Sequence, residues 1–260
     1  MLGVGHGATL DLYNTCFVIQ NEGGNFLIDT GGSIEIVKRL NQMNIELSSI
    51  KDIFVSHSHT DHLLGLIWMF KRMATLKLDS NHKVNLYCND VTYDAIIKVA
   101  EQVLSEGLIK KVFSNFNIQI LTDGNKKIIH NIEYTFFDIR AKGPKQYGFE
   151  CTLNNKKLVF LGDEPLNKEL FDRVKNSDYV MHEAFCLDSE QDIFHPYEKN
   201  HSTAKSACEV MNELNVKNII LYHTEESHKE KRKELYIEEG KKYFNGNVLV
   251  PNDLEILELK

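Results

Sequence analysis

The chain has 260 residues, of which 42% are hydrophobic and 26% are charged, and this composition excludes a disordered or fibrous protein. Its 30 basic and 37 acidic residues give a formal net charge of −7, so the sequence lacks the positive charge that dominates affinity for nucleic acids. We therefore expect a small-molecule substrate and no long nucleic acid among the partners.

Apolar segments with strand character alternate with short helical patterns in the first half of the chain. Helices are predicted at 34–40 and at 92–107, where Gly107 closes the second one. Strands are predicted at 16–20, 25–32, 50–57 and 80–88. This alternation indicates the α/β class.

The second half continues with the same kinds of element. A helix is predicted over 203–214 with Ser202 as its N-cap, and a charged surface helix over 229–244. Further strands are predicted within 128–139, at 248 and at 254–257.

Two pairs of segments repeat along the chain. Residues 50–57 and 216–223 are similar apolar strands, 166 positions apart, and each ends in a histidine. Residues 26–29 and 158–163 are apolar strands that each end in an aspartate close to a glycine. We therefore expect a single domain built from two similar halves, with four polar strand ends at one edge. The halves are about 1–125 and 126–260.

A dense group of metal-binding side chains follows the strand predicted at 50–57. The segment reads His57-Ser58-His59-Thr60-Asp61-His62 and precedes an apolar run. In an extended segment His57 and His59 point to one side, and a helical turn starting near Asp61 brings Asp61 and His62 back toward the same point. Four imidazole and carboxylate groups in six residues, joined by ligands from elsewhere in the chain, exceed what one tetrahedral ion uses. We therefore predict two adjacent divalent metal ions.

This motif resembles the His-x-His-x-Asp-His signature of the metallo-β-lactamase superfamily. Residues 27–31 resemble the early strand and Asp-x-Gly turn of that superfamily, so the likeness extends over nearly the whole chain. The resemblance implies an αββα sandwich of two mixed β-sheets flanked by helices, with the metals at one edge of the sheets.

The same resemblance implies a set of metal ligands. Phe160–Asp163 resembles the segment that supplies the bridging aspartate, and Leu221–His223 resembles the late metal-binding segment. The implied ligands of the first metal are His57 and His59. The implied ligands of the second metal are Asp61, His62 and His223, with Asp163 as the bridge.

One ligand of the superfamily pattern is missing. A further histidine normally follows a strand between the signature and the bridging aspartate, but the strand here ends in Asp138-Ile139-Arg140. Asp138 is our candidate for the missing ligand, because it ends this strand and its carboxylate can coordinate a metal as a harder ligand than imidazole. Arg140 cannot coordinate a metal but could hold an anionic substrate, and His130 lies at the wrong end of the strand. A carboxylate here, or no ligand, would tilt the first site from zinc toward manganese or iron.

The second half resembles the ribonuclease Z and phosphodiesterase branch of the superfamily. His182-Glu183-Ala184-Phe185 is similar to the branch's His-Glu-Ala-Thr loop, and His201-Ser202-Thr203 to its His-Ser-Thr segment. The resemblance implies that His201 protonates the leaving oxygen while Glu183 orients it. The alternatives are that His201 only flanks a helix cap and that Glu183 is a surface carboxylate.

The resemblance implies a metal-dependent hydrolase in which Asp61 orients the attacking water. Asp163 follows Asp138 by only 25 positions, too few for the long arm with which ribonuclease Z enzymes grip tRNA. A compact phosphodiester, nucleotide-like or cyclic, is therefore the expected substrate, and zinc, manganese or iron the expected metal.

The differences between this sequence and the superfamily pattern leave three alternatives to this function. The first is a non-catalytic or regulatory protein with an incomplete metal site. The second is a hydrolase of another ester class, such as a lactone or a thioester. A diiron oxygen or NO reductase fits poorly, since that branch has a carboxylate where His59 stands, and the length leaves no room for a flavin domain.

The sequence also predicts where the protein resides. Its five cysteines form no close pair with zinc-ribbon or redox spacing, which indicates a reducing compartment. The first residues lack a signal-peptide pattern, and the apolar run 63–70 is far shorter than the roughly 20 residues that span a bilayer. We expect a cytoplasmic protein without membrane contacts, and a homodimer is an open possibility.

Overall fold

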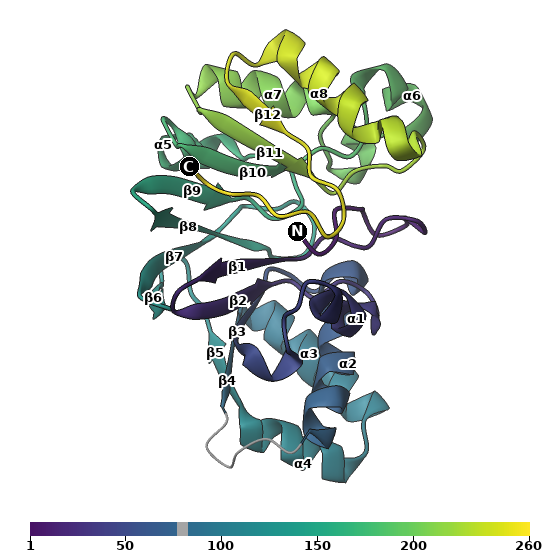
Figure 1. Cartoon of the computed structure of the whole chain (residues 1–260), viewed down its shortest axis with the longest axis vertical. Helices are drawn as coiled ribbons and strands as arrows, with labels where there is room; N and C mark the ends of the chain where they lie inside the picture. The colour runs from purple at the N-terminus through teal and green to yellow at the C-terminus, as the bar shows by residue number, and fades with distance from the viewer. Residues whose placement is uncertain (77–82) are drawn as a thin grey trace.

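Two β-sheets face each other in the computed structural model, which describes residues 1–76 and 83–260 (Figure 1). Helices cover the outer side of each sheet. Both sheets mix parallel and antiparallel pairs, so the predicted αββα sandwich is confirmed. The first sheet contains, in spatial order, β1 (Phe17–Asn21), β2 (Gly24–Ile28), β3 (Ile50–Val55), β4 (Val84–Cys88) and β5 (Phe116–Ile120).

The second sheet is formed by the later part of the chain. Its four strands β9 to β12 run parallel, and β8, β7 and β6 extend it by antiparallel pairing. That the chain is a single domain built from two similar halves stays a prediction. The spatial order is β12 (Asn247–Leu249), β11 (Asn218–Tyr222), β10 (Tyr179–Glu183), β9 (Lys156–Phe160), β8 (Tyr147–Leu153), β7 (Ile132–Asp138) and β6 (Lys126–Ile129).

Eight α-helices and five 3₁₀ helices connect these strands in the described part of the chain. None of the helices found there is long and apolar enough to cross a bilayer. The α-helices are α1 (Glu35–Gln42), α2 (Thr60–Thr75), α3 (Asp90–Val103), α4 (Glu106–Asn115), α5 (Phe171–Val174), α6 (Gln191–Phe194), α7 (Ala204–Glu213) and α8 (Arg232–Tyr243). The 3₁₀ helices are η1 (Leu47–Ser49), η2 (Lys168–Leu170), η3 (Asp188–Glu190), η4 (Tyr197–Lys199) and η5 (Lys229–Lys231).

Both faces of each sheet are buried, so the strands carry apolar side chains on both sides. Side chains alternate along a strand, so in β3 Ile53 and Val55 pack under the helices while Phe54 enters the space between the sheets. That space is filled by aromatic rings, such as Phe54 against Phe136 and Phe149 against Phe160. A rigid sandwich of this kind holds the strand ends, where the polar residues lie, in fixed positions.

Several sequence predictions differ from the structure at element boundaries. The helix predicted over 92–107 is two helices, α3 and α4, because the chain is extended at Leu104 and Ser105. Gly107 therefore lies in the first turn of α4 and closes nothing. The N-cap of α7 is Thr203, whose hydroxyl accepts from Ser206 N, and not Ser202.

Two predicted strands also need correction. Residues 254–257 form no strand, and Leu254 has a positive φ of 60°, which interrupts an extended segment. The strand predicted at 80–88 begins at Val84 in β4, and residues 80–82 lie outside the described part of the chain.

Candidate metal centre

The link between β3 and α2 positions the first group of polar side chains. β3 ends at Val55, and α2 begins at Thr60 and carries Asp61 and His62 in its first turn. His59 occupies the N-cap position but makes no side-chain cap hydrogen bond, so its imidazole stays available. The amino end of a helix also favours a carboxylate in its first turn, which stabilises ionised Asp61.

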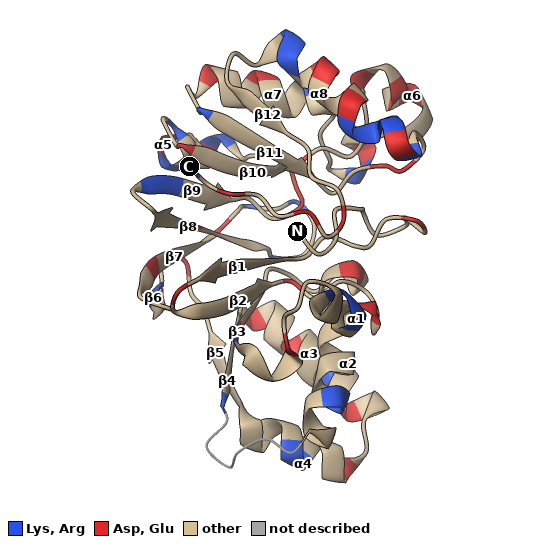
Figure 2. Ribbon diagram, in the orientation of Figure 1, with Lys and Arg blue, Asp and Glu red and all other residues tan. Residues whose placement is uncertain are grey.

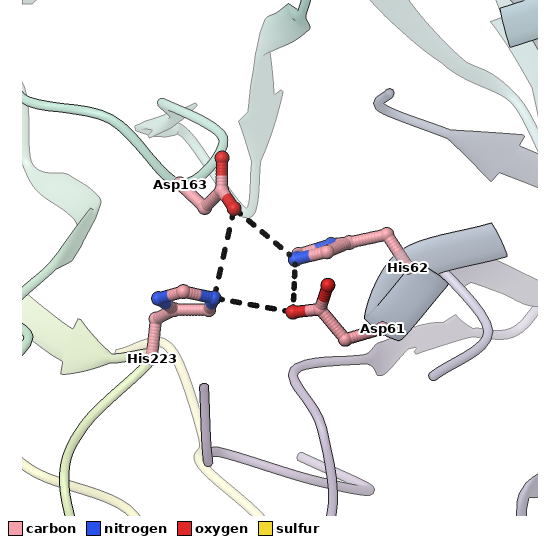
Figure 3. A group of neighbouring side chains, drawn as sticks. All are labelled: Asp61, His62, Asp163 and His223. Carbon is pink, nitrogen blue, oxygen red and sulfur yellow. Dashed lines mark hydrogen bonds and ion pairs between the residues drawn. The ribbon is translucent and has the colours of Figure 1, made fainter. Parts of the chain in front are cut away.

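The ends of two strands in the second sheet supply the other members. Asp163 follows β9, and His223 follows β11. Figure 3 shows Asp61, His62, Asp163 and His223 pointing toward one another. The sandwich therefore brings together residues that lie up to 162 positions apart in the chain.

Asp163 is the shared member of two groups of potential ligands, and a third group, Glu183, His201 and His223, lies beside them. Its Oδ2 lies 3.3 Å from His57 Nε2, 3.8 Å from His59 Nδ1, 3.4 Å from His62 Nε2 and 3.6 Å from His223 Nε2. One group is His57, His59 and Asp163, and the other is Asp61, His62, Asp163 and His223. Within each group the ligand atoms lie within 4.8 Å of one another.

The donor atoms of these groups fit divalent metal ions. His57 Nε2, His62 Nε2 and Asp163 Oδ1 are buried and have no hydrogen-bond partner among the described residues. Buried polar atoms without partners are costly unless a ligand satisfies them. Imidazole nitrogens and carboxylate oxygens suit zinc, manganese and iron, so the residues present match such ions.

A hydrogen-bond network orients two of the imidazoles. Asp29 Oδ2 lies 2.8 Å from His62 Nδ1 and 2.8 Å from the Ser56 hydroxyl, and that hydroxyl lies 2.9 Å from His57 Nδ1. Because the Nδ1 atoms are engaged, both rings present Nε2 to the centre. The sequence alone predicted no role for Asp29 or Ser56, although polar residues at the ends of two buried strands were the available signal.

Asp29→Asn tests this network. The change keeps the shape of the side chain but removes its charge, so we expect the affinity for metal to fall roughly 10- to 100-fold. Competition with a chelator measures this loss. The matched control is Asp52→Asn, since Asp52 is also a buried carboxylate beside a histidine, His130, at 3.3 Å, but belongs to neither ligand group. An equal loss in both variants would contradict an orienting role for Asp29.

Electrostatics keeps the carboxylates of the centre ionised. Burial alone would raise the pKa of Asp163, but the imidazoles of His57, His59 and His62 hold it well below its usual range. Burial would also raise the pKa of Asp61, but the imidazoles of His62 and His223 outweigh this effect, so the pKa of Asp61 is lowered as well. Burial lowers the pKa of His223, which favours the neutral imidazole that a metal ligand requires.

The structure does not bring Asp138 into this cluster. Its Oδ1 accepts a hydrogen bond from Arg140 N at 2.8 Å, and its Oδ2 lies 3.3 Å from Arg140 Nη1. None of the three ligand groups found among the described residues contains it. The prediction that Asp138 replaces the missing histidine therefore finds no support, since Arg140 already neutralises this carboxylate. Arg140 also contacts Asp123 and Glu169.

A histidine and a glutamate lie directly beside the metal centre. Glu183 ends β10, and its Oε1 accepts from Ser202 N at 2.6 Å while its Oε2 lies 3.5 Å from His201 Nδ1. The rings of His201 and His223 are 5.1 Å apart between centroids. Phe185 stacks on His201 at 4.9 Å, with 13° between the planes.

This contact changes the acidity of His201. Burial would lower the pKa of His201, but the Glu183 carboxylate raises it above its usual value. The protonated imidazole is therefore favoured close to the cluster, where it can donate a proton. His182 lies elsewhere, since its Nε2 accepts from Leu166 N and its Nδ1 lies 2.6 Å from the Glu183 carbonyl oxygen.

Known proteins are similar to nearly the whole chain. A sequence model of the family described as "Anti-Pycsar protein Apyc1" matches residues 1–248. A ribonuclease Z of Archaeoglobus fulgidus is 25% identical over 93% of this chain and 90% of its own length. This relative confirms the resemblance to the ribonuclease Z branch, and it gives no support to our expectation that long nucleic acid is absent from the partners.

Solved structures share the fold. The metallo-β-lactamase fold protein YhfI from Bacillus subtilis has a TM-score of 0.76 at 16% identity, covering 97% of this chain and 95% of its own. The short form of human tRNase Z has a TM-score of 0.75 at 18% identity, covering 100% of this chain and 98% of its own. The fold predicted from the motif is thereby confirmed.

Proposed function

The chain belongs to the family of the anti-Pycsar protein Apyc1, and we propose that it is a two-metal phosphodiesterase that acts on a small nucleotide-like or cyclic phosphodiester. Its fold and its ribonuclease Z relatives already place it among metal-dependent hydrolases. The observation that carries the finer proposal is the carboxylate of Asp163, which two groups of ligands share beside a His–Glu pair.

Each ligand group would hold one ion. His57, His59 and Asp163 would bind the first, and Asp61, His62, Asp163 and His223 the second. The first ion has fewer protein ligands, so we expect it to bind more weakly and to accept manganese or iron as well as zinc. Such ions supply Lewis-acid chemistry, because they lower the pKa of a water and offset negative charge on a phosphoryl group.

The side chains of this chain divide the remaining work. Asp61, kept ionised by His62 and His223, accepts a hydrogen bond from the attacking water and orients it. His201, made more basic by Glu183, donates a proton to the departing oxygen. Glu183 fixes the position of His201, because its other oxygen is held by the backbone of Ser202.

Two features support a small substrate over RNA. Between Asp138 and Asp163 the chain forms the short β8–β9 hairpin, which is no long arm for gripping RNA. The net charge of −7 disfavours the binding of a long polyanion such as RNA. Figure 2 shows Lys and Arg interspersed with Asp and Glu on α8.

A substrate panel tests the proposal. The metal-loaded protein is offered cyclic mononucleotides, bis(p-nitrophenyl) phosphate, a tRNA precursor, a lactone and a thioester. We expect the highest kcat/KM for a small phosphodiester. Faster cleavage of the tRNA precursor would indicate RNA processing, and preference for the lactone or thioester would indicate another ester class. Weak metal binding without turnover would support the non-catalytic alternative.

A further inference from the structure

Gln146 is a buried polar residue to which the proposed reaction assigns no role. It directly precedes β8 and is fully buried. Its Oε1 accepts a hydrogen bond from the backbone N–H of Asp163 at 3.2 Å. Its Nε2 is buried and has no hydrogen-bond partner among the described residues.

The backbone around Gln146 connects it to both segments that carry metal ligands. Tyr147 N donates to the carbonyl of Ser56, the residue before His57, at 3.0 Å. On the other side Gln146 holds the backbone of Asp163. Gly162 permits this approach, since its φ is +69° and a Cβ there would lie only 2.8 Å from Gln146 Oε1.

The orientation of the Gln146 amide follows from its hydrogen bond with Asp163 N–H. The Asp163 N–H is a donor, so it must face the oxygen of the Gln146 amide and not the nitrogen. The NH₂ group is therefore the part without a partner. An NH₂ group donates hydrogen bonds and cannot coordinate a cation, so a metal ion does not satisfy it.

Four other buried atoms without partners at the centre have a different explanation. His57 Nε2 and His62 Nε2 are metal-binding atoms, and His201 Nδ1 and Glu183 Oε2 face each other in the acid pair. Gln146 Nε2 instead belongs to an amide whose oxygen is bound to Asp163 N–H, and an acceptor oxygen of a bound ligand would satisfy it. In a phosphodiesterase the anionic phosphoryl group supplies such an oxygen.

We propose that Gln146 is a phosphoryl-binding residue, whose Nε2 donates a hydrogen bond to a phosphoryl oxygen of the substrate while its Oε1 holds Asp163 in place. This inference rests on the proposed function for the nature of the bound anion. A neutral amide adds a hydrogen-bond donor to the centre without adding charge.

Phosphate affinity tests this assignment in the metal-loaded protein. Gln146→Met preserves size and removes the NH₂ donor together with the acceptor of Asp163 N–H. We expect inorganic phosphate to bind roughly 10- to 100-fold more weakly to this variant by calorimetry. The matched control is Ser177→Ala, which removes a buried hydroxyl that has no hydrogen-bond partner in the described part of the chain and belongs to no ligand group found there. This control should leave phosphate affinity and metal content as they are.

A second variant covers the case in which Gln146→Met fails to fold. Gln146→Glu keeps an acceptor for Asp163 N–H but replaces the donor by a carboxylate, so phosphate should bind at least as weakly. Unchanged phosphate affinity in the folded variants overturns the inference, and so does loss of an ion in Gln146→Glu, because this variant keeps the acceptor for Asp163 N–H. Calorimetry with phosphate needs no turnover, so these outcomes stay distinct from failure of the proposed phosphodiesterase activity.

Discussion

Asp163→Ala should abolish turnover and reduce the metal content to one ion per chain or fewer, while the fold remains intact. Asp163 is the one carboxylate that both ligand groups share, and its Oδ2 lies within 3.8 Å of nitrogens from four histidines. Its removal takes a ligand from both ions and leaves imidazoles without a balancing negative charge. Because metal ions contribute several kcal/mol to such reactions, the loss of kcat should be on the order of 10³-fold or more.

Asp138→Ala is the matched control, since Asp138 is also an aspartate at a strand end of the second sheet but pairs with Arg140. We expect wild-type metal content and turnover in this variant. Elemental analysis and steady-state kinetics on both proteins measure the difference. Unchanged metal content and activity in Asp163→Ala would remove the two-metal proposal, and loss of metal in Asp138→Ala would restore Asp138 as a ligand.

His201→Ala should lower kcat by roughly 10² to 10⁴ for a substrate with a poor leaving group, such as an alkyl phosphodiester. An alkoxide needs a proton as it departs, and the Glu183 carboxylate keeps the pKa of His201 raised for this purpose. The loss should be much smaller for p-nitrophenyl esters, because p-nitrophenolate departs without a proton. Glu183→Gln should show the same contrast in weaker form, since it perturbs the imidazole without removing it.

His195→Ala is the control for the second prediction, because the His195 side chain is 55% exposed in a neighbouring loop and pairs only with Glu198 among the described residues. It should behave as wild type on both substrates. Metal content should remain unchanged in every one of these variants. An equal loss on both esters in His201→Ala, or a loss of metal, would show that His201 is a ligand or a structural residue.

The sequence was most informative where ligands are close together or end buried strands. His57 to His62 form one local motif, and Asp163 and His223 each follow an apolar strand, so the repeated pattern of polar strand ends placed them at a sheet edge. The helix boundary at Leu104 was missed because a single extended residue pair leaves little trace in the hydrophobic pattern.

Contacts between distant segments were harder to predict. Asp138 ends its strand as expected, but the turn that follows brings Arg140, two positions later, back onto its carboxylate. Ser56 and Gln146 gave no distinctive pattern, because their roles depend on how Asp29 and Asp163 approach them across the sandwich. Such pairings depend on tertiary packing, which residue spacing does not encode.

Stepwise metal loading tests the two-metal account most directly. Metal-free protein is titrated with Mn²⁺ or Zn²⁺ in a calorimeter while turnover of bis(p-nitrophenyl) phosphate is followed in parallel. We predict two binding steps per chain, the tighter one at Asp61, His62, Asp163 and His223, with activity appearing only during the second step. Saturation at one ion per chain with full activity would contradict the account.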